Sequence, residues 1–180
     1  VMLSPQQVSS QWMCISAAFS YNNTEETTVR PDSFELVGKL AWDGYAKANR
    51  SCSGQEMAKV FHETCRLTYC AGDGSVAIFS QEEFCNKVQN RYTLDPHSDF
   101  ADHAQDARLS DYDSLDAIDF CGPDLAMVTL RIGHPPCLWT DYLTCARLDG
   151  QWWIVHKSSC HELHPLVAVW ESEQPDSNIS

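Results

Sequence analysis

Basic residues are scarce in this chain. Its 180 residues include 12 Lys and Arg against 25 Asp and Glu, which gives a formal net charge of −13. A field of that sign repels phosphate backbones and anionic lipid surfaces. We therefore expect neither nucleic acid nor a membrane among the partners of this protein.

Long apolar runs are also missing. No stretch approaches the ~18 consecutive apolar residues of a membrane-spanning helix. The longest apolar stretch near the start, residues 12–19, has no basic residue before it, so it makes a poor signal peptide. These absences predict a cytoplasmic protein, in which the sequons at Asn22, Asn49 and Asn178 would go unused.

No C-x-x-C motif occurs among the nine cysteines, and their number is odd. Most of them stand where the interiors of helices and strands are expected, and there a free cysteine behaves as a small hydrophobe. We therefore expect reduced thiols, with a disulfide framework as the alternative. A thiol inside a β-core is usually inert, so we assign no nucleophilic role to Cys145 or Cys160.

The strongest local signal is a β-hairpin at residues 137–162. Two runs rich in aromatic, β-branched and threonine residues flank the dipeptide Asp149-Gly150. This dipeptide is typical of a two-residue type I′ turn, whose geometry fixes the register of the flanking strands.

The register of the hairpin follows by counting outward from the turn. It places Leu143 opposite His156 and Asp141 opposite Ser158. Because side chains alternate along a strand, Asp141 and His156 then share one face as diagonal neighbours, and Lys157 points to the other face.

Neither face of the hairpin is a plain solvent face. A hairpin that is partly apolar on both sides must be covered twice, by helices and a ligand on one side and by a second sheet or subunit on the other. The face of Asp141 also carries Trp139, Leu143, Trp152 and Ile154, and the opposite face carries Tyr142, Thr144, Trp153 and Val155.

Three signatures of a helix N-terminus precede the hairpin. Each places a capping Ser or Asp three residues before a Glu that can reach back to the first turn. After the first signature, apolar residues recur at helical spacing and predict a buried helix face. The pairs are Asp32 with Glu35, Ser53 with Glu56, and Ser80 with Glu83; the apolar positions are Phe34, Val37, Ala41, Tyr45 and Ala48.

Helices followed mainly by strands indicate an α+β domain, with the helices on one face of a largely antiparallel sheet. We place this domain at residues 32–164, between an N-terminal extension at 1–31 and a C-terminal tail at 165–180. Besides the hairpin, strands are predicted at 66–70, 76–79, 115–121 and 125–132.

The hairpin resembles the ending of a known family. The runs TDYLT at 140–144 and LDGQWWIVHK at 148–157 look like the T-D-Y-L-T, then D-G-x-W-x-I-V-x-K, of the nuclear-transport-factor-2-like superfamily, in its SnoaL-like branch named "putative lumazine-binding". Weaker support comes from Phe61-His62 and from AID at 117–119. The resemblance covers roughly residues 34–162.

This resemblance implies a curved antiparallel sheet wrapped around three N-terminal helices, a cystatin-like cone with an internal pocket. It also implies a homodimer formed through the outer face of the sheet. It does not imply one chemistry, because the superfamily includes ketosteroid isomerases, polyketide cyclases, scytalone dehydratase, epoxide hydrolases and protein-association modules. Its enzymes typically work without a cofactor, and we expect none here.

Asp141 and His156 are the candidate catalytic residues. Enzymes of the superfamily move protons in an apolar cavity, where burial brings the pKa of a carboxylate or imidazole toward the working pH. Diagonal neighbours lie about 7 Å apart, a gap that these two side chains can nearly close. A ligand-lining role without catalysis, or a structural role as a hydrogen-bond acceptor, is the alternative.

Five further residues are candidates for ligand binding. Trp139 and Trp152 share the face of Asp141 and would form stacking walls. Tyr45, His62 and Tyr69 come from the region that lines the cavity in the relatives, although such tyrosines are often core residues with a satisfied hydroxyl.

The sequence supports neither the activity of scytalone dehydratase nor a metal site. The Tyr-Asp pair and the middle-strand His of scytalone dehydratase are missing, since Tyr45 precedes Ala46 and residues 115–132 contain no His. The His and Asp residues of the irregular segment 91–113 could offer ligands to a metal ion, but nothing fixes their geometry. We expect a solvated acidic loop and no metal.

The sequence as a whole predicts a protein that binds a small apolar or heteroaromatic molecule inside the cone. An isomerase, cyclase or dehydratase activity by acid-base chemistry is an extension of that prediction. The alternative is a non-catalytic dimerisation or protein-association module. In that case the cavity would be filled by the protein's own side chains, for example Leu166, Val169 and Trp170 of the tail.

Overall fold

The computed structural model describes residues 29–93 and 98–173. Most of the expected N-terminal extension lies outside the described residues. So do Cys14, His97 and the sequons at Asn22 and Asn178.

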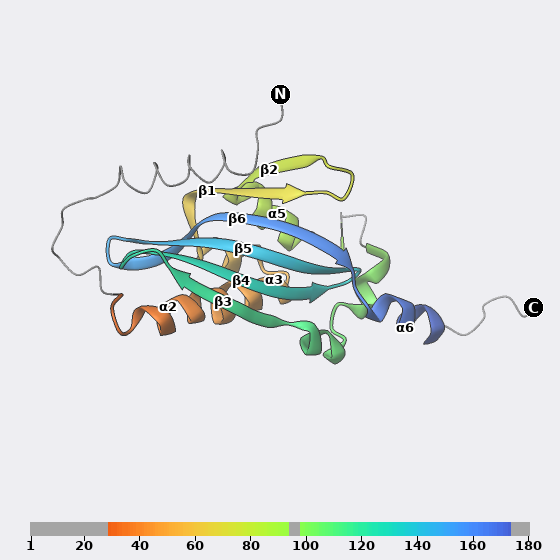
Figure 1. Ribbon diagram of the computed structural model, residues 1–180. Coiled ribbons are helices and arrows are strands. Elements are labelled where there is room, and N and C mark those ends of the chain that lie inside the picture. The colour runs from red at the N-terminus through yellow and green to blue at the C-terminus, as the bar shows by residue number, and fades with distance from the viewer. Residues whose placement is uncertain (1–28, 94–97, 174–180) are drawn as a thin grey trace, which may run out of the picture.

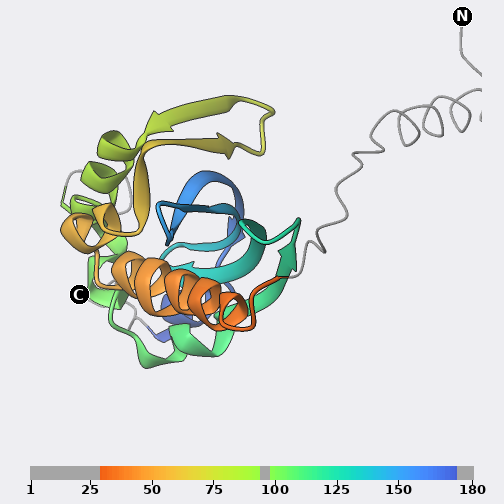
Figure 2. The ribbon, with the colours of Figure 1, turned by 90° about the vertical axis from the view of Figure 1, so that its left-hand side faces the viewer.

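Six strands form one curved sheet. They are β1 (Phe61–Cys70), β2 (Val76–Ser80), β3 (Ser114–Phe120), β4 (Leu125–His134), β5 (Cys137–Leu148) and β6 (Gln151–Leu163). Their order across the sheet is β2-β1-β6-β5-β4-β3, and all neighbours are antiparallel except β1 and β6, which are parallel. Figure 2 shows this sheet from one end as an arc that does not close. The predicted α+β fold class is confirmed.

The helices lie on the concave side of the arc, as Figures 1 and 2 show. The longest is a continuous rod made of α2 (Ser33–Lys39), the π-helical segment η1 (Leu40–Ala46) and α3 (Lys47–Arg50). Helices α4 (Gly54–Ala58) and α5 (Gln81–Gln89) follow. The predicted arrangement of three helical units against the sheet is therefore present.

The helix starts agree with two of the three predicted capping signatures. Ser80 and Glu83 form a complete capping box, and the side chain of Ser53 accepts a hydrogen bond from the backbone N–H of Glu56. Asp32 makes no side-chain cap, because its backbone is already helical (φ −84°, ψ −14°) rather than extended as a capping residue requires.

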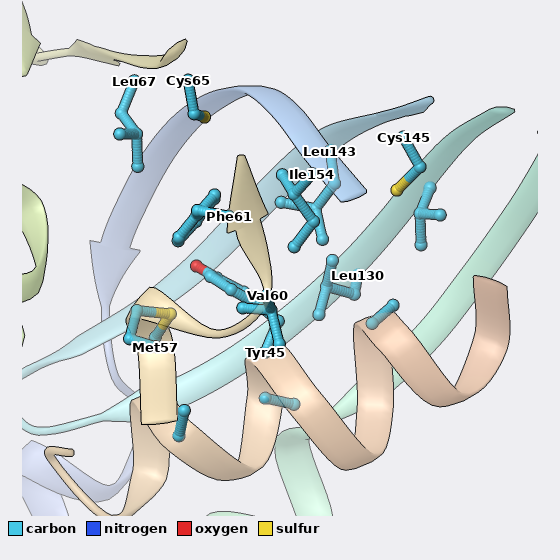
Figure 3. Packing of buried hydrophobic residues seen from close by; sticks show 14 of the residues in the cluster. Tyr45, Met57, Val60, Phe61, Cys65, Leu67, Leu130, Leu143, Cys145 and Ile154 are labelled. Atoms are coloured by element: carbon cyan, nitrogen blue, oxygen red, sulfur yellow. The ribbon is translucent and has the colours of Figure 1, made fainter. Parts of the chain in front are cut away.

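The predicted apolar face of the rod packs against the sheet. Val37, Ala41, Tyr45 and Ala48 are buried, whereas Phe34 is 62% exposed. The rod comes close to Val60, the residue before β1, at Gly44, where a Cβ atom would lie 2.6 Å from a methyl carbon of Val60. Figure 3 shows the resulting core, in which side chains of the rod meet apolar side chains of β1, β4, β5 and β6, among them Phe61, Leu130, Leu143 and Ile154.

The segment predicted as a tail contains a helix, α6 (Leu166–Glu173). Figure 1 places it beyond the ends of β5 and β6. It packs on the 3₁₀-helical segments η2 (Ser98–His103) and η3 (Ala107–Tyr112), where the indole N–H of Trp170 donates to Asp106 Oδ2 at 2.7 Å. This second cluster buries Leu109, Leu166, Val167 and Trp170.

The hairpin turn is the predicted one. Asp149 and Gly150 both have positive φ angles, 51° and 82°, as a type I′ turn requires, and Leu148 pairs with Gln151 across it.

The predicted register of the hairpin is wrong beyond Cys145. Cys145 pairs with Ile154 as expected, but Thr144 pairs with His156, so Val155 has no partner on β5. One extra residue on one strand is a β-bulge, and it reverses the inward and outward faces of every residue that follows on that strand.

Candidate functional site

A cavity of about 450 Å³ lies between the concave face of the sheet and helix α5. One wall comes from β1, β2 and α5, and the facing wall comes from β5 and β6. Its lining is Asn49, Leu67, Thr68, Tyr69, Ala77, Phe79, Phe84, Lys87, Val88, Arg91, His134, Trp139, Asp141, Lys157, Ser159 and His161.

A buried ion pair stands in the wall of this cavity. Because of the bulge at Val155, Leu143 pairs with Lys157 and Asp141 pairs with Ser159, so Lys157 points inward. Its Nζ lies 2.6 Å from Asp141 Oδ1, and the two residues are only 3% and 1% exposed. Removing either partner would leave the other charge buried without compensation, which is strongly unfavourable.

Three aromatic rings surround the ammonium group of Lys157. Its Nζ lies 5.2 Å from the ring centroid of Phe84, 5.8 Å from that of Trp139 and 5.9 Å from that of Tyr45. Cations within about 6 Å of a ring centroid are attracted by the negative face of the ring. The rings and Asp141 together hold this charge in an otherwise apolar place.

Asp141 ends a chain of hydrogen bonds that begins at Arg91. The guanidinium of Arg91 donates to Asn49 O and Oδ1, at 3.0 and 2.7 Å. The amide of Asn49 donates to Tyr45 Oη at 3.2 Å, and Tyr45 Oη donates to Asp141 Oδ2 at 2.7 Å. Burial, and then the charge of Asp141, raise the pKa of Tyr45 well above its usual value. Tyr45 therefore keeps its proton and remains a donor.

Helical spacing positions the middle of this chain. Tyr45 and Asn49 are four residues apart, across the junction of η1 and α3, so both side chains leave the same side of the rod. Figure 3 shows the Tyr45 ring rising from the rod toward Phe61, with which it makes an edge contact at 5.8 Å between centroids.

A group of four aromatic side chains forms another part of the lining. The Trp139 ring stacks with His134 at 5.4 Å and 26°, and lies 4.6 Å from the ring of His161. The Tyr69 ring stacks on His161 at 5.6 Å and 12°, and its hydroxyl lies 3.1 Å from His161 Nδ1. The four rings pack on one another, with Trp139 tilted by 44° to His161 and by 54° to Tyr69, and give this part of the lining an aromatic surface.

Three of the residues predicted for the site line the cavity: Asp141, Trp139 and Tyr69. Tyr45 is fully buried behind the lining and contacts Asp141. Trp152 is in the hydrophobic core, where its ring lies edge-on to Phe120 at 6.0 Å, and it is not among the lining residues.

The two histidines predicted for the site, His156 and His62, are not among the residues that line the cavity. His156 pairs with Thr144 on the outer side of the bulge, and its Nε2 lies 3.4 Å from Thr68 Oγ1. His62 Nδ1 lies 2.8 Å from Thr64 Oγ1, and its ring contacts Trp153. The predicted pairing of Asp141 with His156 is therefore wrong in position, and so is the prediction that Lys157 points away.

Lys157, Asn49 and Arg91, the polar residues linked to Asp141, were not predicted from the sequence as site residues. Lys157 was misplaced by the bulge. Asn49 could have been found, because it follows Tyr45 by one helical turn. Arg91 carries no signal in the sequence, since it follows α5 at the start of an irregular segment.

Outside the cavity, Asp106 is part of an ion pair and the described cysteines are free thiols. Asp106 binds the guanidinium of Arg108, which lowers the pKa of Asp106 far below its usual value. The eight cysteines of the described residues form no disulfide, and burial raises the pKa values of Cys65 and Cys145 to about 12. In residues 29–93 and 98–173, His, Cys, Asp and Glu side chains form no group suited to a metal ion.

A family model described as "Putative lumazine-binding" matches residues 34–158, more than half of the chain. The chain belongs to this family. The region shared with the lumazine-binding family includes Tyr45, Asn49, Arg91, Asp141 and Lys157, and it ends before α6.

Solved structures show that the fold is that of the nuclear-transport-factor-2-like superfamily. An NTF2-like protein of unknown function from Shewanella baltica matches with a TM-score of 0.61 at 13% identity, over 76% of this chain and 99% of that one. Similar proteins of unknown function from Silicibacter pomeroyi (TM-score 0.55, 18% identity, 72% and 95% covered) and Methylobacillus flagellatus (0.52, 20%, 76% and 97%) match as well. Such identities show the fold alone.

The curated proteins include no match to this chain. Within the described part of the chain, none of the helices is both long and apolar enough to cross a membrane.

Proposed function

We propose that this protein binds a small, flat, largely apolar or heteroaromatic molecule in the cavity. The observation that carries the proposal is the buried ion pair of Asp141 and Lys157 in the wall of an open cavity of about 450 Å³. Ligand pockets combine mainly apolar walls with a few convergent polar groups, and the volume is within their usual range.

The two parts of the lining suit the two parts of such a ligand. Its ring would pack against the aromatic side chains around Trp139, and an acceptor atom at its edge would bind the ammonium of Lys157. An ammonium has three N–H donors, and the contact of Lys157 with Asp141 Oδ1 is an ion pair at 2.6 Å. The description of the family, which names the heteroaromatic lumazine, supports a ligand of this kind.

Proton-transfer catalysis is the second candidate function. Asp141 is the carboxylate of the cavity lining, and Lys157 lies against it. Tyr45 and Lys157 already engage both carboxylate oxygens, so a reaction that protonates Asp141 would have to break one of these contacts. This arrangement favours binding over turnover.

The association-module alternative requires a filled cavity. The segment expected to plug the cone supplies Leu166 and Trp170 to the second cluster, and neither residue is among those that line the cavity. This placement favours a ligand.

Thermal shift of the full chain against lumazines, pterins, flavins, steroids and polyketide-like aromatics tests the proposal. A ligand at 100 times its Kd stabilises the folded state by about 2.7 kcal/mol, which raises Tm by several degrees. A shift that disappears when Lys157→Met is combined with Asp141→Asn would support the site.

The matched control is His156→Phe, which changes the residue next to Lys157 on the outer side of the bulge. We expect it to keep the full shift. A shift that survives the double variant would place binding elsewhere, and no shift across the library would favour the association module.

A further inference from the structure

We infer that the ligand of this cavity is an anion: a planar aromatic molecule with a carboxylate or another ionised acidic group. This inference rests on the proposed function and adds the charge of the ligand to it.

The lining of the cavity carries a net positive charge, whereas the chain as a whole is acidic. The chain as a whole carries −13, but the cavity lining holds three cationic side chains, Lys87, Arg91 and Lys157, against one carboxylate, Asp141. The lining thus has an excess of two positive charges. In a chain with so few basic residues, this concentration creates a local field that attracts anions.

Arg91 is one of the two buried cations of the lining. It is 7% exposed, and among the residues that the structure describes its hydrogen-bond acceptors are the two oxygens of Asn49, a neutral residue. A guanidinium has five N–H donors arranged to bind a carboxylate through two of them. Arg91 is among the residues that line the cavity.

The hydrogen-bonded chain shares one negative charge between two cations. Each link from Arg91 through Asn49 and Tyr45 donates toward Asp141, and Lys157 contacts the same carboxylate from the other side. The single charge of Asp141 is therefore fully engaged. One of the two cations at the ends of the chain remains for a charge that the ligand supplies.

Lys87 extends the cationic surface to α5. Its Nζ lies 5.1 Å from the ring centroid of Phe79, and both residues line the cavity. Glu83, four residues earlier on the helix, lies close enough to feel its charge, but that carboxylate is held by the backbone N–H and hydroxyl of Ser80.

The apolar part of the lining strengthens the effect of these charges. Leu67, Phe79, Phe84 and Val88 keep the local dielectric constant low, and Coulomb attraction grows as that constant falls. A neutral ring would satisfy the apolar walls and leave the positive excess uncompensated. An aromatic anion would satisfy both.

Binding of two matched probes by the full chain tests the inference. 2-Naphthoate and 2-naphthamide share one ring system and differ in charge, and calorimetry gives the Kd of each. We expect the naphthoate to bind at least about tenfold more tightly, because hydrogen bonds to charged groups are the stronger ones.

Lys87→Gln identifies the cavity as the source of this preference. This residue is exposed, so the change leaves the core intact, and it should weaken naphthoate binding about threefold or more while naphthamide binding stays the same. The control is Lys59→Gln, which removes an equal charge from an exposed lysine that is not among the lining residues. It should change neither Kd.

The outcomes separate the inference from the proposed function. Equal affinity for the two probes, or tighter binding of the amide, overturns the inference and leaves the proposed function in place. An equal loss of naphthoate affinity in the Lys87 and Lys59 variants also overturns it, because the preference would then come from net charge. If neither probe and no library compound binds, both fail.

Discussion

Thr144 of β5 pairs with His156 of β6, one residue further along β6 than an unbroken ladder would place it. This offset turns Lys157 inward, into contact with Asp141, and leaves His156 on the outer side. The chemistry of the cavity therefore depends on a single unpaired residue, Val155. A lysine and a carboxylate meet where the uninterrupted pattern would have put an imidazole.

Removing the charge of Lys157 should lower the stability of the folded protein. A second substitution, at Asp141, should restore most of that stability. We expect Lys157→Met to lower the free energy of unfolding by about 3–5 kcal/mol, because Asp141 would stay buried without its cation. Adding Asp141→Asn should restore most of that stability. Urea unfolding of the two single variants and the double variant measures the coupling. Simple additivity of the two changes would show that the pair contributes nothing as a unit.

Removing the buried hydroxyl of Tyr45 should destabilise the folded protein more than removing the exposed hydroxyl of Tyr142 on β5. Tyr45→Phe removes the donor to Asp141 and the acceptor of Asn49, so we expect a loss of about 1.5–3 kcal/mol in the free energy of unfolding. Tyr142→Phe removes an exposed hydroxyl and should change it by less than about 0.5 kcal/mol. Denaturation of both variants under the same conditions makes the comparison. Equal losses would contradict the buried network.

Stability should fall on mild acidification because of His164. Burial lowers the pKa of this imidazole below its ordinary value of 6.5, and its Nδ1 accepts a hydrogen bond from the backbone N–H of Leu166. The unfolded chain then binds a proton more readily than the folded one. The contribution of the neutral ring is complete above pH 6.5 and is lost as the pH falls from there through the lower folded value.

The variant His164→Asn isolates this effect, since asparagine keeps an acceptor near the start of α6 but does not titrate. Its free energy of unfolding should change less between about pH 7 and pH 5 than that of the natural chain. Parallel slopes for the two proteins would assign the pH dependence to other groups.

We propose that the outer face of the sheet joins two copies of the chain, as the family resemblance implies. Met127 and Tyr142 are exposed on β4 and β5, at 49% and 46%, and Trp153 of β6, which pairs with Ala146, is half-buried. Light scattering should give twice the chain mass of 20.3 kDa. The double change Met127→Glu and Tyr142→Glu should yield the monomer, and Phe34→Glu, an exposed position on α2, should not. A natural chain that is already monomeric contradicts the proposal.

The sequence was informative where structure is local. The turn at Asp149 and Gly150, the capping box at Ser80 and the buried face of the rod follow from short-range chemistry, and each is present. The fold class followed from the order of these elements.

The bulge at Val155 could not be predicted from the local sequence. At Val155, β6 is irregular toward both neighbours, since the register with β1 also shifts between Phe61 and Arg66. The irregularity belongs to the bending of a sheet around its core, so it depends on strands far away in sequence. Arg91 and α6 were missed for the same reason, because their partners, Asn49 and Leu109, are remote along the chain.

The parallel pairing of β1 with β6 determines when the cavity can form during synthesis. The β1 and β2 hairpin and α5 leave the ribosome before β6 (residues 151–163), so β1 must wait for β6 before it gains its second neighbour. Contacts of such sequence separation form late in folding. Nascent chains that end before the turn at Asp149 should therefore display an unpaired edge on β1, which is a surface that chaperones could hold.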